Sequence, residues 1–266
     1  MQGRRASRGS APHPLVVRPI HVSTTIEILP VQIDREFVEG DDLAAMIHDA
    51  APTMRDGDVV VITQKVVSKT EGQVVDLRDV EPSSAARELA GSDSDPRMVE
   101  VVLRESKRVV RHRGPLIITE THHGFVCANA GVDRSNAPRL DAVVLLPRDP
   151  DASAWRLRAR LEELSAARLA VVIADTMGRP LRDGIVGTAI GASGLNPLRD
   201  LAGAIDPVGF HLASTIVAIA DELASAADLV LGKLERVPAA VIRGYVTTGD
   251  GSARQLLRDP ARELFV

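Results

Sequence analysis

The chain has 266 residues, with 32 Lys and Arg against 36 Asp and Glu, so its formal net charge is −4. This mildly acidic balance argues against general nucleic-acid binding, because the phosphate backbone favours basic surfaces. Aromatic residues make up only 2% of the chain, which argues against flavin, sugar or base sites built on aromatic side chains.

The single cysteine and the N-terminal residues indicate the cellular compartment of the protein. Because Cys127 is the one cysteine, the chain cannot form an internal disulfide, a Cys-rich zinc site or an iron–sulfur cluster site. This composition is consistent with the reducing cytoplasm. No apolar stretch is long enough to span a membrane. Residues 1–22 are rich in Arg, Ser, Gly and Pro, which predicts a disordered leader rather than a secretory signal. The ordered domain is expected over residues 23–266.

This domain is predicted to begin with a strand in the β-branched run at 24–33. Residues 40–52 predict a helix whose cap is either Asp41 or Asp42. The run from 59 to 63 is apolar without a break, which is the pattern of a strand buried on both faces.

The middle of the chain predicts a mixture of short elements. Residues 79–96 are polar with room for a short helix, and 97–112 predict an amphipathic helix or a passage from helix to strand. The alternation across 116–133 predicts a β-hairpin with Gly124 near its turn. Another buried strand is predicted within 141–150.

The last third contains the clearest helix, at 151–168, with Asp151 as its expected cap. A strand is predicted at 169–176, a long Ala-rich helical run at 211–231 and a last strand at 239–245. Strands and helices mix without a strict βαβ order, which favours an α+β fold over a doubly wound sheet. The predicted apolar stripe of the 151–168 helix consists of Trp155, Leu157, Leu161 and Leu164.

The most informative segment for function is the strand that ends in Asp175 and Thr176. A carboxylate followed by a hydroxyl at a strand end can hold Mg²⁺ or Mn²⁺, which prefer hard oxygen ligands. The glycine-rich stretch at 178–194 is expected to let the backbone approach a ligand closely. Alternatively, Asp175 only caps a helix or forms a turn.

Two further segments carry candidate ligand groups. Asp133 could ligate a metal and Asn136 could bind a phosphate or a base, although a plain Asx turn explains the same residues. Gln64 and Lys69 follow the buried strand, where Lys69 could contact phosphate or simply face solvent. The chain contains neither a Walker A loop nor a GxGxxG motif.

Other polar residues are given structural interpretations. The pair His122 and His123 lacks the spacing of a zinc site, and Cys127 is expected to be a small buried apolar residue. The acidic pair Asp221 and Glu222 is expected on the solvated face of its helix.

In their order along the chain, these segments resemble the coenzyme F420:L-glutamate ligase family, the gamma-glutamyl ligases of deazaflavin cofactor biosynthesis. Actinobacterial members often carry a nitroreductase-like second domain, and the single-domain form is expected here. The resemblance covers most of the predicted domain. The segments that carry it are IEILPV at 26–31, GDDL at 40–43, DGDVVVITQKVVSKTEG at 56–72, ANAGVDRSN at 128–136, ADTMGRPLRDGIVGTAIGASG at 174–194, ADELASAADLVLGK at 220–233 and AVIRGY at 240–245.

The resemblance implies a gamma-glutamyl ligase-like fold of two intertwined α+β subdomains and a homodimer with its sites at the subunit interface. It implies GTP as a substrate, one or two Mg²⁺ or Mn²⁺ ions, and potassium as a further candidate ion. The implied reaction joins the lactyl carboxylate of the precursor F420-0 to the amine of L-glutamate through an acyl phosphate. Further glutamates are then added through γ-linkages.

By position, the resemblance implies that Asp133 and Asp175 hold the first metal ion and Thr176 the second. The implied catalytic groups are Asp133, Asp175 and Lys69. The implied GTP contacts lie in 34–37, in 231–238 and on single residues between them. These contacts are Asp34, Arg35, Glu36, Phe37, Gln64, Lys69, Asn136, Gly232 and Lys233.

The sequence departs from the family pattern at two places. Many relatives have a Gly-Leu-Pro-Glu-like segment where this chain has residues 32–36, which bears on nucleotide preference. Archaeal relatives tend to have an acidic metal ligand at the position of Lys233, so the lysine is expected to neutralise phosphate charge instead. These departures leave two alternatives, a catalytically silent nucleotide-binding subunit and the same chemistry on another carboxylate acceptor.

Overall fold

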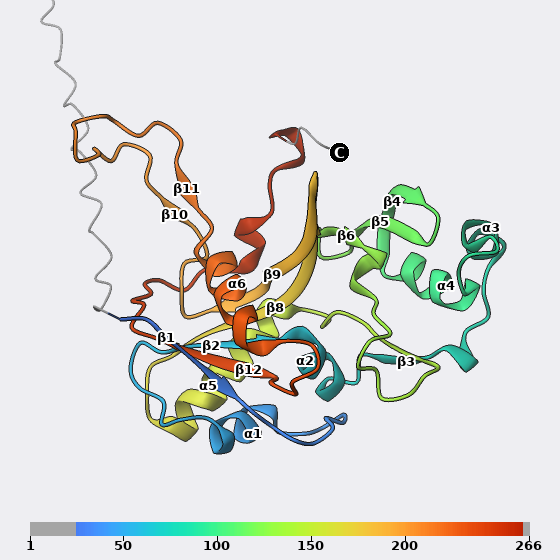
Figure 1. The fold of residues 1–266 in the computed structure, drawn as a ribbon, viewed down its shortest axis with the longest axis horizontal. Coiled ribbons are helices and arrows are strands. Elements are labelled where there is room, and N and C mark those ends of the chain that lie inside the picture. Colours follow the sequence, from blue (N-terminus) through green and yellow to red (C-terminus); the bar gives the residue numbers. More distant parts are fainter. Residues whose placement is uncertain (1–24, 263–266) are drawn as a thin grey trace, which may run out of the picture.

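A five-stranded mixed sheet forms the centre of the computed structural model, which describes residues 25–262 (Figure 1). The predicted leader at 1–22 therefore lies outside the described residues. β2 and β8 run parallel, and the other neighbouring pairs are antiparallel. In sheet order, the strands are β1 (Glu27–Val31), β12 (Ala239–Arg243), β2 (Val59–Thr63), β8 (Ala170–Arg179) and β9 (Arg182–Ser193).

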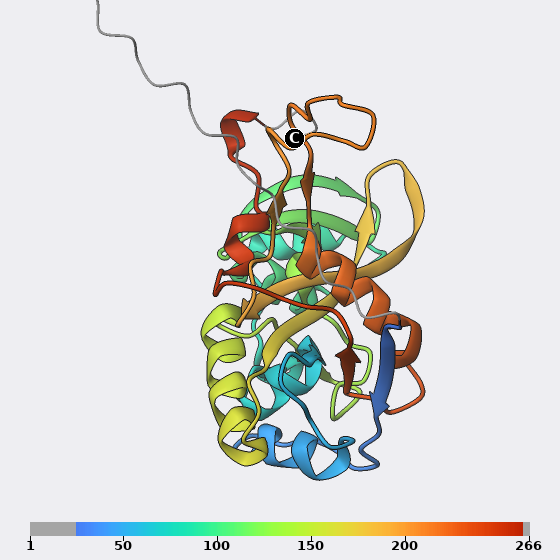
Figure 2. The ribbon, with the colours of Figure 1, turned by 90° about the vertical axis from the view of Figure 1, so that its left-hand side faces the viewer.

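Helices cover both faces of this sheet, which explains why β2 is apolar along its whole length. Val60 and Ile62 of β2 pack into the core under α1 (Leu43–Ala50) and α5 (Pro150–Ser165). The alternate residues Val59 and Val61 pack into a second core, under α6 (Ile219–Leu231). Figure 2 shows α5 and α6 on opposite sides of the sheet. The strand predicted to be buried on both faces is confirmed.

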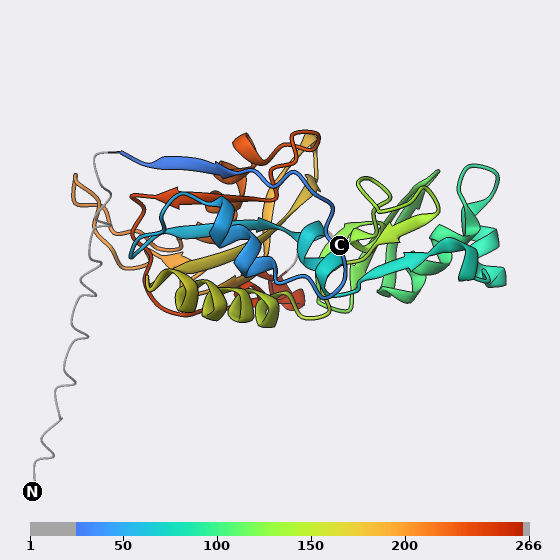
Figure 3. The same cartoon turned by 90° about the horizontal axis from the view of Figure 1, so that it is seen from below.

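A second region is inserted into the chain between β3 (Val74–Asp76) and β7 (Ala142–Val144), which pair with each other. This region has its own apolar core and extends to one side of the central sheet (Figures 1 and 3). The predicted hairpin is present, with Gly124 in its turn at a φ of +97°. The elements of this region are η1 (Leu77–Asp79), α3 (Ser84–Ala90), α4 (Pro96–Arg104), β4 (Ser106–Arg113), β5 (Leu116–Thr121), β6 (Val126–Ala128) and η2 (Asn129–Gly131).

The remaining elements flank the sheet. α2 (Gln64–Thr70) follows β2 directly, and a small hairpin is formed by β10 (Arg199–Asp200) and β11 (Ile216–Val217). The last described elements are two short turns of 3₁₀ helix, η3 (Ala253–Leu256) and η4 (Pro260–Arg262). Helices and sheets thus form the predicted α+β fold. Within residues 25–262, none of the helices combines the length and the apolar composition that a membrane span needs.

The structure corrects three details of the predicted helices. α5 begins earlier than expected, so Asp149 is its cap, whereas Asp151 accepts hydrogen bonds from backbone N–H groups outside the helix. Trp155 does not belong to the apolar stripe, because 58% of its surface is exposed. The helix predicted at 211–231 begins only at Ile219, since the residues before it form β11 and its turns.

Candidate functional site

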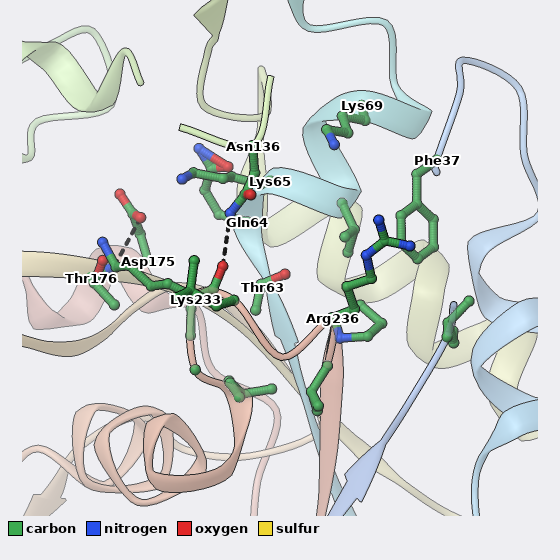
Figure 4. A pocket seen from close by; sticks show the side chains of 18 of the residues that line it. Phe37, Thr63, Gln64, Lys65, Lys69, Asn136, Asp175, Thr176, Lys233 and Arg236 are labelled. Carbon is green, nitrogen blue, oxygen red and sulfur yellow. Dashed lines mark hydrogen bonds between the residues drawn. The ribbon is translucent and has the colours of Figure 1, made fainter. Parts of the chain in front are cut away.

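A cavity of about 280 Å³ lies where β2 ends, beside residues 174–176 of β8 (Figure 4). In the parallel pairing, Thr63 is in register with Ala174. Gln64, at the start of α2, and Asp175 therefore lie next to each other beyond the end of β2. The expected strand end at Asp175 and Thr176 is wrong, because β8 continues to Arg179. The cavity is lined by Ile33, Arg35, Glu36, Phe37, Thr63, Gln64, Lys65, Val66, Lys69, Asn136, Ala174, Asp175, Thr176, Gly187, Asp228, Leu231, Gly232, Lys233, Leu234, Arg236, Val237 and Pro238.

The structure brings most of the predicted site residues together in this cavity. Two of them, Asp34 and Asp133, do not line it but contact residues that do. The Asp34 carboxylate lies 2.6 Å from Arg236, and the Asp133 carboxylate lies 2.7 Å from the Lys65 ammonium. The predicted residues that line the cavity directly are Arg35, Glu36, Phe37, Gln64, Lys69, Asn136, Asp175, Thr176, Gly232 and Lys233.

Asp175 stands at one end of the cavity, beside Thr176 (Figure 4). Its carboxylate accepts a hydrogen bond of 2.8 Å from the Thr176 N–H. Burial raises the pKa of Asp175 to about 6 and the Asp133 carboxylate acts in the same direction, against Thr176, Lys65 and Lys233. A carboxylate held in this way lacks a full counter-charge, so it is suited to binding a cation.

Asp133 is held by the second region of the fold. Its backbone pairs with Val144 of β7, and its side chain accepts hydrogen bonds from the backbone and hydroxyl of Ser135. Burial raises the pKa of this carboxyl, but Lys65 and Ser135 outweigh burial and keep the pKa below its ordinary value. Asp133 is therefore charged and already paired with a cation.

Lys69 lies in the last turn of α2, on the far side of the cavity from Asp175 (Figure 4). Only 7% of its side chain is exposed, and its ammonium donates a 3.2 Å hydrogen bond to Glu36. Glu36 itself is largely exposed. An almost buried cation whose one acidic partner faces solvent can exchange that partner for an anionic ligand.

Gln64 supplies an acceptor with no partner. Its side chain is 1% exposed, and its amide donates to the Leu145 carbonyl at 3.4 Å. Its Oε1 atom is buried and accepts no hydrogen bond from any residue in the described part of the chain. Because an unpaired buried acceptor costs free energy, this atom fits a hydrogen-bond donor on a ligand.

Asn136 links the second region to the loop that follows α6. Its amide donates a 3.1 Å hydrogen bond to the Lys233 carbonyl, which is dashed in Figure 4. α6 is followed by its C-cap Gly232, whose φ of +58° turns the chain across the cavity. The loop from 232 to 238 therefore forms one wall, and Lys233 lowers the pKa of Asp175 from that side.

The donor set suits a metal ion that is shared with a phosphorylated ligand. Between residues 25 and 262, no three His, Cys, Asp or Glu side chains gather as a metal cluster. Asp133, Asp175 and the Thr176 hydroxyl offer two carboxylates and one neutral oxygen. Magnesium is commonly held by one or two carboxylates together with substrate phosphates. The residues present therefore fit Mg²⁺ or Mn²⁺ with a nucleotide completing the coordination.

The glycines behind Asp175 have a different role from the predicted one. A Cβ on Gly187 would overlap the Ala224 carbonyl of α6, and one on Gly191 would overlap the Pro150 carbonyl at the start of α5. These two glycines let helices pack closely on β9. The expectation that they serve ligand approach is wrong for Gly191, whereas Gly187 also lines the cavity.

Sequence reasoning gave Lys65 no role, although it lines the cavity. Lys65 carried a usable signal, because it stands four residues before Lys69 and such residues share one face of a helix. Arg236 also lines the cavity, within the segment 231–238 that the resemblance implies for GTP. Asp221 was also misread, because it accepts a 2.9 Å hydrogen bond from the Ala189 N–H. Burial raises the pKa of Asp221.

One structural interpretation from the sequence is confirmed, and the two histidines have contacts of their own. Cys127 is buried in the main core, and burial raises the pKa of its thiol to about 12. The ring of His123 stacks on Phe125 at 5.8 Å, and its Nε2 lies 3.0 Å from the Pro147 carbonyl. The His122 Nε2 lies 3.0 Å from the Arg104 carbonyl.

Comparisons with known proteins agree with the earlier resemblance. Residues 34–244 match the family described as F420-0:Gamma-glutamyl ligase. The chain is 48% identical to the coenzyme F420:L-glutamate ligase of Methanopyrus kandleri, over 91% of this chain and 98% of that protein. It is 44% identical to the protein of the same name from Methanothermobacter thermautotrophicus, over 85% and 93% of the two chains. The one from Methanocaldococcus jannaschii is 46% identical, over 80% and 86%.

Proposed function

The chain belongs to the F420-0:gamma-glutamyl ligase family, and from this premise we propose that it joins L-glutamate to the deazaflavin precursor F420-0 at the expense of GTP. The proposal includes the addition of further glutamates through γ-linkages and a cytoplasmic location. The observation that carries it is the cavity beside β2 and β8, which contains an unpaired carboxylate, three lysines and a buried acceptor without a partner.

The proposed chemistry activates a carboxylate before the amide forms. The lactyl carboxylate of F420-0 attacks the γ-phosphorus of GTP, the bond to the bridging oxygen breaks, and GDP leaves with that electron pair. The resulting acyl phosphate is attacked by the glutamate amine, which loses a proton as inorganic phosphate departs. Such a phosphoryl transfer depends mainly on positioning and on neutralising charge. The cavity provides no His or Cys nucleophile and needs none.

Asp133, Asp175 and Thr176 are the residues that would hold the divalent ions. When bound, such an ion neutralises phosphate charge and orients the reacting oxygens. The chain's own cations have complementary tasks: Lys69 and Lys233 face the cavity from opposite walls and balance the negative charge of the nucleotide. Because Lys233 cannot ligate a metal while charged, we propose one firmly held ion and a second that depends on the nucleotide.

Support for GTP comes from Gln64. Its orphan Oε1 requires a donor, and the guanine base carries N–H groups on its Watson–Crick edge. The altered segment keeps a defined shape, because Arg35 pairs with Asp41 at 2.9 Å and Asp34 pairs with Arg236. Nucleotide binding in this segment therefore survives its departure from the family pattern.

We include a homodimer in the proposal, because two projecting segments expose apolar side chains. The β8–β9 hairpin ends at Leu181, which is 96% exposed, and the β10–β11 loop exposes Val208 and Phe210 at 89% and 65%. Both segments project from the same end of the molecule (Figures 1 and 2). Burial of these side chains against a second copy would remove apolar surface from water.

The testing experiment incubates the purified full chain with F420-0, GTP, Mn²⁺ and L-glutamate and reads the products by mass spectrometry. We expect a ladder of products that differ by one glutamate residue and require both GTP and glutamate. Asp175→Ala should nearly abolish the ladder while leaving the dimer intact. Binding of GTP without any glutamate-dependent product would refute the ligase and favour a silent nucleotide-binding subunit.

The acceptor is tested in the same assay by competition. F420-0 is offered together with related precursors that carry a different carboxylate side chain. Preferential consumption of F420-0 supports the proposal. Exclusive use of another precursor keeps the ligase chemistry but contradicts the proposed acceptor.

A further inference from the structure

Lys65 is the cavity cation that sits directly on one of the expected metal ligands. It is the second residue of α2, and 18% of its side chain is exposed. Its ammonium lies 2.7 Å from Oδ2 of Asp133 and 2.5 Å from the Ser135 hydroxyl oxygen. These contacts place a protein-borne positive charge where a metal-binding carboxylate would meet its ion.

Both oxygens of the Asp133 carboxylate accept hydrogen bonds in this arrangement. Oδ1 accepts a 2.7 Å hydrogen bond from the Ser135 N–H. Oδ2 accepts from the Lys65 ammonium and, at 2.9 Å, from the Ser135 hydroxyl. A metal ion can therefore reach Oδ2 only if Lys65 gives way, because two cations at contact distance from one oxygen repel each other strongly.

Asp175 presents the opposite situation. Among the described residues, its carboxylate forms no ion pair, and its one hydrogen-bond donor is the Thr176 N–H. Lys65 acts on Asp175 only through longer-range attraction. The Lys65 ammonium thus acts on two carboxylates from separate segments but contacts only Asp133.

We infer that Lys65 is a positioning residue that holds Asp133 in the ligand-free cavity and competes with a divalent cation for that carboxylate. The inference rests on the proposed function, which assigns Asp133 and Asp175 to one metal ion. Displacement leaves the Lys65 ammonium in a confined cavity without its acid. An anionic nucleotide phosphate then compensates that charge. Metal and nucleotide should therefore bind cooperatively, each more tightly in the presence of the other.

The test measures Mn²⁺ affinity directly, from the electron paramagnetic resonance signal of the free ion, without nucleotide. Lys65→Met should bind Mn²⁺ about tenfold more tightly than wild type, because a charge-assisted contact no longer competes. Lys65→Arg keeps the positive charge and should behave like wild type. Lys107→Met is the matched control. Lys107 also pairs with an acidic residue, Glu120, but it belongs to β4 and does not line the cavity.

The sign of the change separates competition from structural damage. Loss of local structure would weaken Mn²⁺ binding, whereas loss of a competitor strengthens it. In the ligation assay, Lys65→Met should lower the Mn²⁺ concentration at half-maximal rate and also lower kcat, because the phosphate loses a counter-charge. Lys65→Gln replaces the methionine variant if that variant does not fold.

Two outcomes overturn the inference. A folded Lys65→Met protein with wild-type or weaker Mn²⁺ affinity contradicts the competition. This result would not contradict the proposed ligase function, which glutamate ligation by the wild-type enzyme supports separately. A wild-type protein that binds no Mn²⁺ with or without GTP contradicts the metal assignment itself, and the role of Lys65 with it. Product formation, read separately by mass, distinguishes these two failures.

Discussion

Replacement of Asp175 by asparagine should make the metal-free protein more stable while removing its activity. The substitution keeps the shape of the side chain and an oxygen that can accept from the Thr176 N–H. It removes a negative charge whose formation the folded protein opposes, because burial raises the pKa of Asp175 to about 6. Asp175→Asn therefore separates the stability of the site from its function.

The magnitude follows from the pKa. A carboxyl that titrates at about 6 instead of 3.8 disfavours its charged form in the folded state by about 3 kcal/mol, since a tenfold change in proton affinity corresponds to about 1.4 kcal/mol. This value is an upper bound, because solvent reaches part of the side chain. In the window between the two pKa values the folded state binds more protons than the unfolded state, so wild-type stability falls as pH rises. The advantage of Asp175→Asn should grow from about pH 4 to about pH 6 and then stay constant.

The assay is urea unfolding of both proteins across this pH range in the presence of a metal chelator. Asp221→Asn is the matched control, because burial also raises the pKa of Asp221 although it lies outside the cavity lining. The control should gain stability in the same direction yet keep Mn²⁺ binding and turnover. An Asp175→Asn protein that is less stable than wild type at neutral pH, or fully active, would refute the reasoning.

Three further predictions concern the fold around the site. Asp58→Ala should lower the free energy of unfolding by about 3–5 kcal/mol, because Asp58 is buried and pairs through both oxygens with Arg243. Urea titrations measure this loss. A loss below about 1 kcal/mol, the range of exposed ion pairs, would contradict the prediction. Glu100→Gln should lower the melting temperature at neutral pH, because donors from Ser83 and Arg104 lower the pKa of Glu100 to about 2. A lowered carboxyl pKa stabilises the fold at pH values above the ordinary pKa of 4.5. The difference in melting temperature between wild type and Glu100→Gln should therefore shrink as pH falls toward 2. A difference that does not depend on pH would contradict this prediction. Phe210→Ser should weaken the proposed dimer in light-scattering measurements without changing the secondary structure, and an unchanged dimer would place the interface elsewhere.

Local patterns in the sequence were sufficient to predict most elements. The unbroken apolar run of β2 predicts burial on both faces because each face meets a different core. The sequence predicts that one of two neighbouring aspartates caps α1, and in the structure the cap is Asp42. The α5 cap was misplaced, because Asp149 and Asp151 offer the same chemistry and only packing distinguishes them.

The cavity could not be derived from local patterns, because it depends on strand order. Gln64 and Asp175 meet only because β2 and β8 are parallel neighbours in register. The resemblance supplied their association, and the structure supplies the geometry. Lys65 was missed because its role depends on its ion pair with Asp133. That carboxylate belongs to a distant part of the sequence, and only the fold brings it beside Lys65. Gly191 was misread because the start of α5 rather than a ligand occupies the space beside it.

The central claim is that this cavity activates a carboxylate by transferring a phosphoryl group from GTP. It is tested most directly with F420-0 in which both oxygens of the lactyl carboxylate are the heavy isotope, incubated with the full chain, GTP, Mn²⁺ and L-glutamate. Mass analysis of the released inorganic phosphate should show one heavy oxygen for each amide formed. Amide formation with unlabelled phosphate would contradict the claim, because the acceptor oxygen would then never have been bonded to phosphorus.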